Sequence, residues 1–350
     1  MCYEIASFLA RNNFNSVRLP ISLASVLHDT APDLAFVNAS ENRALRLDNY
    51  TSTLQSIIKA FAYRQISVLI SVDATTKAGT NISEEGYLHA IDKLTSSLCT
   101  SSYWNVLGLD LRSESGQNTT WGDGSATDFR AAATRIGNRM LQGCPSWLVF
   151  VRGIHESDDH LETGETYGFD AWSRGGGLSK TKEFPVTLSI PDKVVYAPHF
   201  YLPGVVPSAN DVYTQRDSAT ELSDAELQET VRDAFDRMIG QLATEPERPA
   251  IVLSGFGGLY LEDKSSYRTS QRTVDYTVKL ISEALGLIGG YAWALNPETS
   301  FTRHGQAAQE GLVTSDWRTA NEPYLEALES LNEIPHLSAT QCFPLNSSRR

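Results

Sequence analysis

Helical and extended segments alternate along most of this 350-residue chain. Apolar residues recur at helical spacing in the longer segments, and short apolar runs bounded by polar or turn residues lie between them. Seven of these runs are typical of β-strands, and they occupy residues 15–21, 66–72, 106–111, 147–151, 194–201, 250–256 and 290–295. Alternation of this kind predicts an α/β fold with a parallel sheet, either open and doubly wound or closed into a barrel.

Two observations favour the barrel. No glycine-rich phosphate loop follows the first strand, so the signature of a dinucleotide-binding sheet is absent from the sequence. In a barrel, by contrast, the strand ends bring their polar and aromatic side chains to one face. The residues concerned are Arg18, Asp73, Glu114, His199 and Trp293.

The chain begins with a helical pattern at residues 3–11, before the first of the seven strands. We therefore predict a (β/α)8 TIM barrel that lacks its first β-strand at the N-terminus. A single domain is expected over residues 1–335, followed by a C-terminal tail at 336–350.

Composition excludes several classes of partner. The formal net charge of −13 argues against nucleic acid and anionic membranes. No apolar run approaches the length of a membrane span, and the four cysteines lie far apart without zinc-ligand spacing. We expect no metal and no cofactor, and a monomer in solution.

The sequence contains five triplets of the N-glycosylation type, which favours a secreted protein. These triplets begin at Asn38, Asn49, Asn81, Asn118 and Asn346. An even number of cysteines is compatible with disulfides in that compartment. Residues 1–13 lack the basic start and long apolar core of a signal peptide, so we expect a secreted form to begin upstream of this sequence.

The strand at 106–111 is followed at once by Arg112, Ser113 and Glu114. Barrel enzymes place their catalytic groups just past the carboxyl ends of such strands, which makes Glu114 a candidate. The alternative is that Glu114 is a solvated loop residue.

Several motifs, in order, resemble glycoside hydrolase family 5, the cellulase type, and the similarity extends over residues 3–331. They are NFNSVRLPIS, VLGLDLRSES, PSWLVFVRGI, KVVYAPHFY, PAIVLSGFG and YAWALNPE. This resemblance implies a (β/α)8 barrel and an ancestral endo-acting, retaining hydrolysis of a β-glucan such as cellulose.

The resemblance also assigns catalytic positions. In the family, strand four ends in Asn-Glu-Pro with the Glu as acid/base, and the matching triplet here is Ser113-Glu114-Ser115. Strand seven of the family ends in Glu-Phe-Gly with the Glu as nucleophile, and here Gly255 takes that place. Glu114 is therefore the acid/base candidate, while the nucleophile position has no side chain. Supporting positions are expected at Arg18, Ser113, His199, Tyr201 and Asp73.

Retaining hydrolysis needs two carboxyl groups about 5 Å apart, so a glycine at position 255 removes the covalent route. We expect the glycine to leave a cavity that admits water or a small anion. Asp73 is the best candidate for a relocated base, although a loop cap or a partner for Arg18 is the favoured interpretation. Arg18 is expected to pair with Asp73 or Glu114, since its family partner is missing.

A sugar contact is expected from Trp293, because an indole face covers the apolar face of a pyranose. The resemblance adds Trp172 and Trp121, which match loops that line the sugar cleft in relatives. His199 and Tyr201 alternate along one strand and should point to the same side. The alternatives are aromatic packing at the barrel mouth for these two residues, and barrel core for Trp293.

Two acidic motifs are given no catalytic role. The triplet Asn321-Glu322-Pro323 spells the family's catalytic sequence, but it precedes an amphipathic segment and predicts a helix start. Residues Glu156, Asp158 and Asp159 form an acidic loop that we expect to be solvated.

These observations give three hypotheses. The first is a degenerate family member that is inactive or very weak as a hydrolase and binds β-glucan polysaccharide or oligosaccharide. The second is an active glycosidase that uses a displaced carboxylate. The third is a non-catalytic interaction or decoy protein without sugar affinity.

Overall fold

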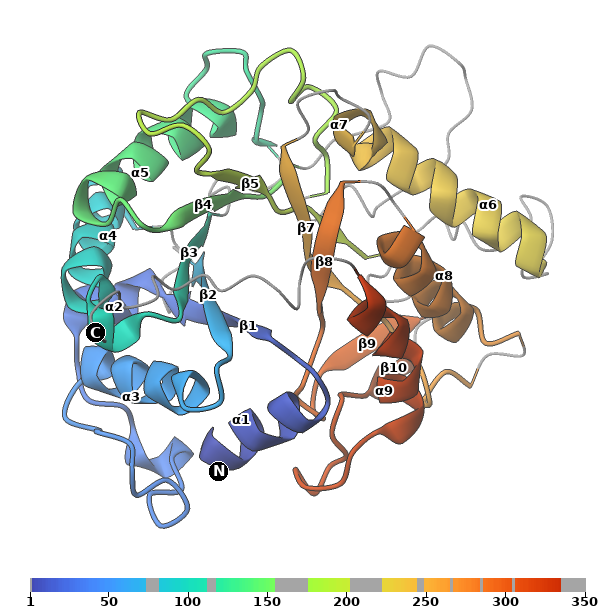
Figure 1. Cartoon of the computed structure of the whole chain (residues 1–350), viewed down its shortest axis with the longest axis horizontal. Coiled ribbons are helices and arrows are strands. Elements are labelled where there is room, and N and C mark those ends of the chain that lie inside the picture. The colour runs from blue at the N-terminus through green and yellow to red at the C-terminus, as the bar shows by residue number, and fades with distance from the viewer. Residues whose placement is uncertain are drawn as a thin grey trace, which may run out of the picture.

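The computed structural model describes residues 2–73, 82–111, 118–154, 176–201, 222–243, 249–264, 267–283, 286–303 and 306–334. Parallel strands curl into a half-barrel with helices on its outer side (Figure 1). The strands are β1 (Ser16–Ser22), β2 (Ser67–Asp73), β3 (Val106–Leu111), β4 (Leu148–Val151), β5 (Val194–Tyr196), β6 (His199–Phe200), β7 (Ala250–Phe256) and β8 (Leu287–Ala292). The predicted α/β barrel architecture is confirmed.

The strand order is β1-β2-β3-β4-β5-β7-β6, and β8 pairs with β7. Strands β5 and β6 both pair with β7, β5 near its start and β6 near its end. They are the two halves of the predicted strand 194–201, which is interrupted at Ala197 and Pro198. The described sheet therefore has the seven barrel strands that the sequence predicts.

Most of the helices lie in the connections between strands, while the first precedes β1 and the last follows the final strand. They are α1 (Cys2–Arg11), α2 (Leu23–His28), α3 (Tyr50–Ala62), α4 (Glu84–Leu98), α5 (Phe129–Gly143), α6 (Asp224–Phe235), α7 (Gln241–Ala243), α8 (Thr269–Glu283) and α9 (Glu322–Leu328). A π-helical stretch (Asp236–Gly240) joins α6 to α7, and short 3-10 turns lie at Leu34–Phe36, Ser101–Tyr103 and Glu329–Glu333. Helix α2 and the antiparallel hairpin of β9 (Ser300–Arg303) and β10 (Gln306–Gln309) are not predicted by the sequence pattern.

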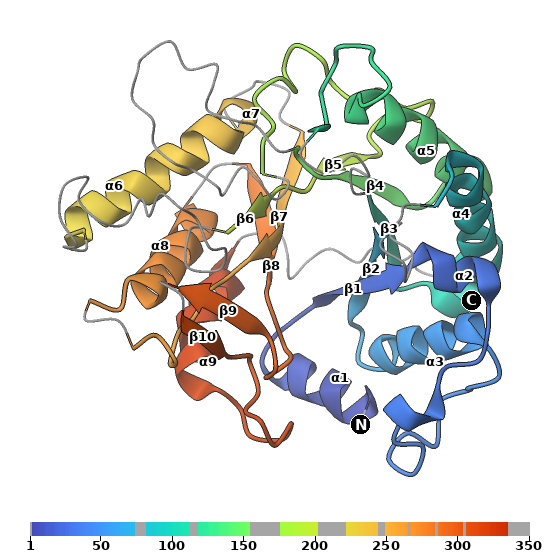
Figure 2. The ribbon, with the colours of Figure 1, turned by 180° about the vertical axis from the view of Figure 1, so that it is seen from behind.

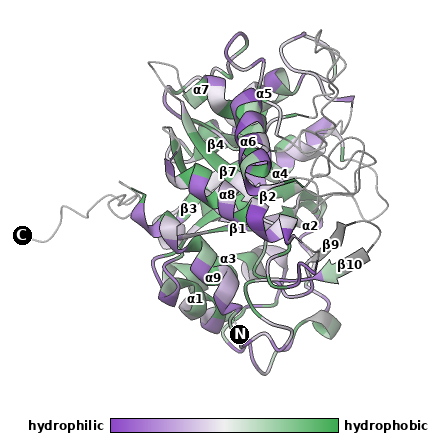
Figure 3. Cartoon of the chain, turned by 90° about the vertical axis from the view of Figure 1, so that its right-hand side faces the viewer, coloured by the Kyte–Doolittle hydropathy of each residue, from purple (hydrophilic) through white to green (hydrophobic). Residues whose placement is uncertain are grey.

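Polar caps define several helix starts. Ser83 accepts a hydrogen bond from the Gly86 backbone N–H at the start of α4, as predicted. Helix α6 begins with a reciprocal capping box between Ser223 and Glu226. Apolar side chains of these helices pack on the outer face of the sheet. Figure 3 shows the strands coloured mainly as hydrophobic and the outer helices as alternating stripes.

The two ends of the sheet face each other across the open side of the half-barrel (Figure 2). The hydroxyl groups of Ser16 on β1 and Tyr291 on β8 lie 2.8 Å apart and form a hydrogen bond across this seam. The partial barrel agrees with the predicted lack of a first strand.

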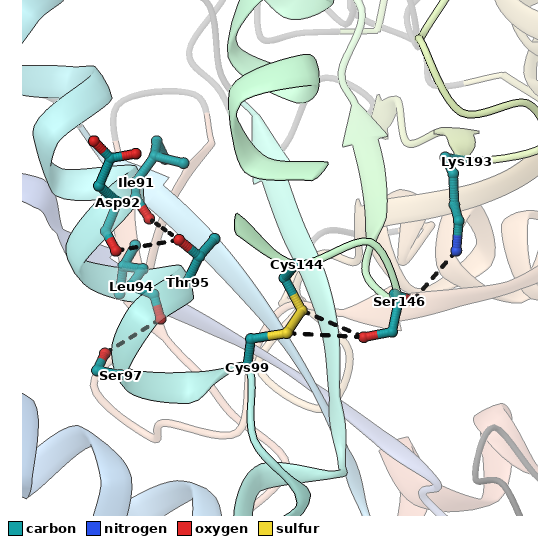
Figure 4. Close-up of a disulfide and its surroundings, with 9 residues drawn as sticks. All are labelled: Ile91, Asp92, Leu94, Thr95, Ser97, Cys99, Cys144, Ser146 and Lys193. Carbon is teal, nitrogen blue, oxygen red and sulfur yellow. Dashed lines mark hydrogen bonds between the residues drawn. A yellow bond between two sulfur atoms is a disulfide. The ribbon is translucent and has the colours of Figure 1, made fainter. Parts of the chain in front are cut away.

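A disulfide joins the ends of two outer helices. Cys99 follows α4 and Cys144 follows α5, and their Cα atoms lie 5.7 Å apart (Figure 4). Arg139 on α5 and Asp92 on α4 form an ion pair between the same helices. Within the described ranges, no helix has both the length and the apolar character needed to span a membrane.

Candidate functional site

A buried polar cluster lies inside the half-barrel, where β1, β2 and β3 run side by side. Ser71 and Asp110 are directly opposite each other in the β2–β3 register. The Arg18 guanidinium donates from Nε to Asp110 Oδ2 at 2.6 Å and from Nη2 to Ser71 Oγ at 2.7 Å. Asp110 is fully buried. The parallel register thus brings together three side chains that are far apart in the sequence.

Arg152, just past β4, binds the same two partners. Its Nε and Nη2 atoms donate to the Asp110 carboxylate at 2.9–3.2 Å, and Nη2 also donates to Ser71 Oγ at 2.7 Å. Two guanidinium groups therefore share one carboxylate and one hydroxyl, which leaves one positive charge in excess among these four side chains. Each guanidinium is hydrogen-bonded to the shared carboxylate and to the shared hydroxyl, which offsets part of the cost of burying it.

Asp110 is a partner of Arg18 that the sequence did not suggest. The two suggested partners, Glu114 and the side chain of Asp73, lie outside the described residues, as does Ser113. The sequence did not identify Asp110 or Arg152 as residues of this cluster. The signal for Asp110 was its place inside an otherwise apolar strand, because a buried carboxylate needs a partner.

On the opposite part of the sheet, Gly255 of β7 pairs in register with His199 of β6. The His199 and Tyr201 rings meet edge to face with centroids 5.4 Å apart. A Cβ atom placed on Gly255 would overlap the Tyr201 hydroxyl and lie 2.9 Å from Tyr201 Cζ and 3.2 Å from His199 Cδ2. The prediction that both side chains point to the same side is confirmed.

The cavity expected at Gly255 stays a prediction. The Tyr201 hydroxyl lies at the place that a Cβ atom of residue 255 would take, and Tyr201 is itself only 7% exposed. The sequence reveals that a side chain is missing there, but not which neighbour moves into the space.

The segment after β7 packs closely against the next strand and α9. Gly257 has φ +142°, and a Cβ atom there would lie 2.6 Å from the Trp293 carbonyl oxygen and 3.1 Å from the Tyr324 hydroxyl. The Gly258 backbone N–H lies 3.3 Å from the Tyr324 hydroxyl oxygen, close enough to donate to it. Burial raises the pKa of Tyr324, so this phenol stays neutral.

Glu310 also holds the backbone segment that follows β7. Its carboxylate accepts hydrogen bonds from the backbone N–H groups of Tyr260, Leu261 and Glu262 at 2.7, 2.8 and 3.0 Å. The Asn321 side-chain amide adds a fourth bond at 2.8 Å. Glu310 is buried and each of its oxygens already accepts two bonds, so its role is to hold the backbone after β7.

Of the three predicted sugar-binding tryptophans, Trp293 offers an accessible ring. It follows β8 and is 38% exposed, its backbone N–H donates to the Phe256 carbonyl at 2.8 Å, and its peptide bond to Ala294 is cis. Trp172 lies outside the described residues. The geometry of Trp293 is that of a side chain available for stacking.

Trp121 is in the hydrophobic core. It is 2% exposed, its indole N–H donates to the Phe184 carbonyl at 2.9 Å, and its ring packs edge to face against Phe129. Such burial leaves no ring face for a sugar, so the prediction that Trp121 contacts sugar is wrong.

The triplet Asn321-Glu322-Pro323 does start a helix, α9, with Pro323 in its first turn. The Asn321 side chain does not cap that helix but donates to Glu310 and to the Gly311 carbonyl. The acidic residues Glu156, Asp158 and Asp159 fall outside the described part of the chain. Among the residues that the structure describes, no group of three His, Cys, Asp or Glu side chains could hold a metal ion.

Comparison with known proteins agrees with this geometry. The cellulase model of glycosyl hydrolase family 5 matches residues 3–298. The chain is 30% identical over 327 residues to the major extracellular endoglucanase of Xanthomonas campestris pv. campestris, and 31% identical over 224 residues to an endoglucanase of Paenibacillus polymyxa. These alignments cover 91% and 64% of this chain but only 60% and 49% of the two relatives.

Solved structures give the same result. The hyperthermophilic endocellulase of Pyrococcus horikoshii superposes with a TM-score of 0.73 and 25% identity, over 94% of this chain and 86% of that one. A cellotetraose complex of an endocellulase from the same organism superposes with a TM-score of 0.72 at 25% identity, again over 94% and 86%.

Proposed function

Because the chain belongs to glycosyl hydrolase family 5, the cellulase family, we propose that it binds β-glucan chains and hydrolyses them very slowly or not at all. The observation that carries this proposal is Gly255, which has no side chain and lies against the Tyr201 hydroxyl. The β-glucan ligand is inferred from the relatives, which are named as endoglucanases and include a cellotetraose complex.

Hydrolysis needs two carboxyl groups, whereas sugar binding does not, so this chain can lose the first and keep the second. In a retaining glycosidase, one carboxyl group protonates the leaving oxygen and a second attacks the anomeric carbon. We assign the first role to Glu114. Position 255 supplies no second carboxylate, so no covalent glycosyl-enzyme can form there, whereas stacking of a pyranose on Trp293 needs neither carboxyl group.

We also propose that the protein is secreted. Three features support this: the Cys99–Cys144 disulfide, the five glycosylation-type triplets, and a relative that is named as extracellular. Disulfides persist in oxidising compartments and are rare in the cytosol.

Binding is tested by titrating the full chain with cellotetraose while following tryptophan fluorescence. We expect saturable binding that weakens roughly tenfold in Trp293→Ala, the loss expected from one stacking contact of about 1.5 kcal/mol. Tyr63→Ala is the matched control, since Tyr63 is 72% exposed on the α3 side, away from β8. No affinity in a folded chain would reject the binding function and favour an interaction protein.

Hydrolysis is tested separately by measuring reducing ends released from a soluble β-glucan. We expect a rate near the background without enzyme. Robust turnover that Glu114→Gln abolishes would reject the pseudoenzyme proposal and favour a displaced carboxylate, for which Asp73→Asn is the diagnostic variant.

A further inference from the structure

We infer that Glu310 is a positioning residue for Trp293. Its carboxylate holds the backbone segment on one side of the tryptophan, and its own main chain holds the segment on the other side. The indole therefore depends on Glu310 for its place at the site. The sugar ligand of this site rests on the proposed function, whereas the geometry does not.

The indole of Trp293 is placed through its backbone. Within the described residues no hydrogen bond reaches the ring N–H, and the side chain is 38% exposed. The Trp293 backbone N–H, in contrast, donates to the Phe256 carbonyl at 2.8 Å. The carbonyl of the next residue, Ala294, accepts from the Leu312 N–H at 3.0 Å. The segments that carry Phe256 and Leu312 therefore set the direction in which the ring projects.

Both neighbouring segments lie very close to the backbone at Trp293. A Cβ atom on Gly257 would lie 2.6 Å from the Trp293 carbonyl oxygen, and one on Gly311 would lie 2.7 Å from the Leu295 carbonyl oxygen. The backbones approach this closely because both residues are glycine. A shift of either segment would therefore displace the backbone that carries the indole.

Glu310 is bonded to both of these segments. Its carboxylate accepts the three backbone N–H groups of residues 260–262, in the segment after β7. Its own N–H donates to the Thr299 carbonyl at 3.0 Å, and Gly311 and Leu312 follow it directly in the chain. One residue thus connects the segment after β7 to the segment after β10, on either side of the tryptophan backbone.

An amide cannot replace this carboxylate. Oε1 of Glu310 accepts from the Leu261 backbone and the Asn321 side chain. Oε2 accepts from the Tyr260 and Glu262 backbones. In glutamine one of the two oxygens becomes an NH2 group that only donates, so two of the four donors lose their acceptor. Glu310→Gln should therefore loosen the segment after β7 while it keeps the volume of the side chain.

The first test needs no ligand and uses ¹⁹F NMR of the chain labelled with 5-fluorotryptophan. The chain has six tryptophans, and Trp293→Phe identifies the resonance of Trp293. We expect Glu310→Gln to shift or broaden that resonance. An unchanged Trp293 resonance in this variant would overturn the inference.

Asp263→Ala is the matched control. Asp263 is also a buried carboxylate in the segment after β7, but it accepts the backbone N–H groups of Ser270 and Gln271 at the start of α8. Its loss should lower Tm and leave the Trp293 resonance in place. A change of that resonance as large as in Glu310→Gln would mean that general loosening, not positioning, moves the ring.

The second test is a double-mutant cycle on cellotetraose affinity. Glu310→Gln should weaken binding roughly threefold or more in the wild type and less than about twofold in a Trp293→Ala background, because it acts through the ring. Asp263→Ala should leave the affinity unchanged in both. Equal losses from Glu310→Gln in the two backgrounds would overturn the inference, since a merely structural role does not depend on Trp293.

The two tests separate this inference from the proposed function. If the wild type does not bind cellotetraose, the proposed function fails and the fluorine spectra decide the positioning role alone. If it binds and the Trp293 resonance is the same in wild type and Glu310→Gln, only the positioning role fails. Glu310→Asp, whose shorter side chain withdraws both oxygens from their donors, replaces Glu310→Gln if that variant does not fold, with the same expected directions.

Discussion

Arg18 and Asp110 form a buried ion pair, with Nε and Oδ2 2.6 Å apart, that connects β1 to β3 across β2. Arg152 approaches the same carboxylate from β4 at 2.9 Å. One aspartate therefore pairs with two guanidinium groups, and together with Ser71 it connects β1, β2, β3 and the end of β4 to each other.

Asp110→Asn should be among the most destabilising single changes in this chain. It removes the carboxylate and leaves two guanidinium groups buried against a neutral amide, at a cost of about 3–5 kcal/mol in the free energy of unfolding. Urea titration followed by circular dichroism measures this loss. Asp92→Asn is the control, because the Asp92–Arg139 pair is about half exposed and its loss should cost less than about 1 kcal/mol. Similar losses for the two variants would contradict this account of the cluster.

The local pattern of apolar, capping and turn residues was sufficient to predict most helices and strands. Both bounds of β7 follow from an apolar run between Pro249 and Gly257, and the start of α4 follows from Ser83. The partners of Arg18 do not follow from local pattern, because they depend on the register of strands that are far apart in the chain. The burial of Trp121 has the same origin, since its hydrogen-bond partner Phe184 is 63 residues away. A missing side chain at position 255 likewise carries no information about which neighbour fills its place.

Removing the Cys99–Cys144 disulfide should lower stability without changing the site. The bridge closes a loop of 45 residues, for which the chain-entropy estimate gives about 4 kcal/mol, the upper end of the range of about 2–4 kcal/mol that is typical of disulfides. The double variant Cys99→Ser/Cys144→Ser should show this loss in urea unfolding, and cellotetraose affinity should be unchanged. Wild-type protein in excess dithiothreitol should match the variant, whereas the reductant should have no effect on the variant itself.

Tyr291→Phe tests the seam between the two ends of the sheet. The variant keeps the ring but loses the hydroxyl that meets Ser16 across the open side, and we expect a loss of about 0.5–1.5 kcal/mol. A double-mutant cycle with Ser16→Ala isolates the contact, because the second change should cost little once the first has been made. Additive losses would mean that the two hydroxyl groups do not stabilise each other.

Asp275 should make the protein less stable as the pH rises, which is opposite to the usual effect of a carboxyl group. Its carboxylate accepts a hydrogen bond from the Tyr260 hydroxyl at 3.0 Å, but burial outweighs that bond and raises the pKa of Asp275 above its ordinary value of 3.8. The folded state therefore holds this proton more tightly than the unfolded state does. The contribution of Asp275 to stability is complete below the ordinary pKa and is lost as the pH rises through the folded-state pKa.

The measurement is the free energy of unfolding of wild type minus that of Asp275→Asn, taken by urea titration from below pH 3.8 up to neutrality. Asparagine keeps an acceptor for Tyr260 and does not titrate, so this difference should fall as the pH rises. Asp316→Asn provides the opposite case, because hydrogen bonds from Thr319 and Arg318 lower the pKa of Asp316, and its contribution should be lost as the pH falls. A difference for Asp275 that is flat, or that follows the direction of Asp316, would show that burial does not control this carboxyl group.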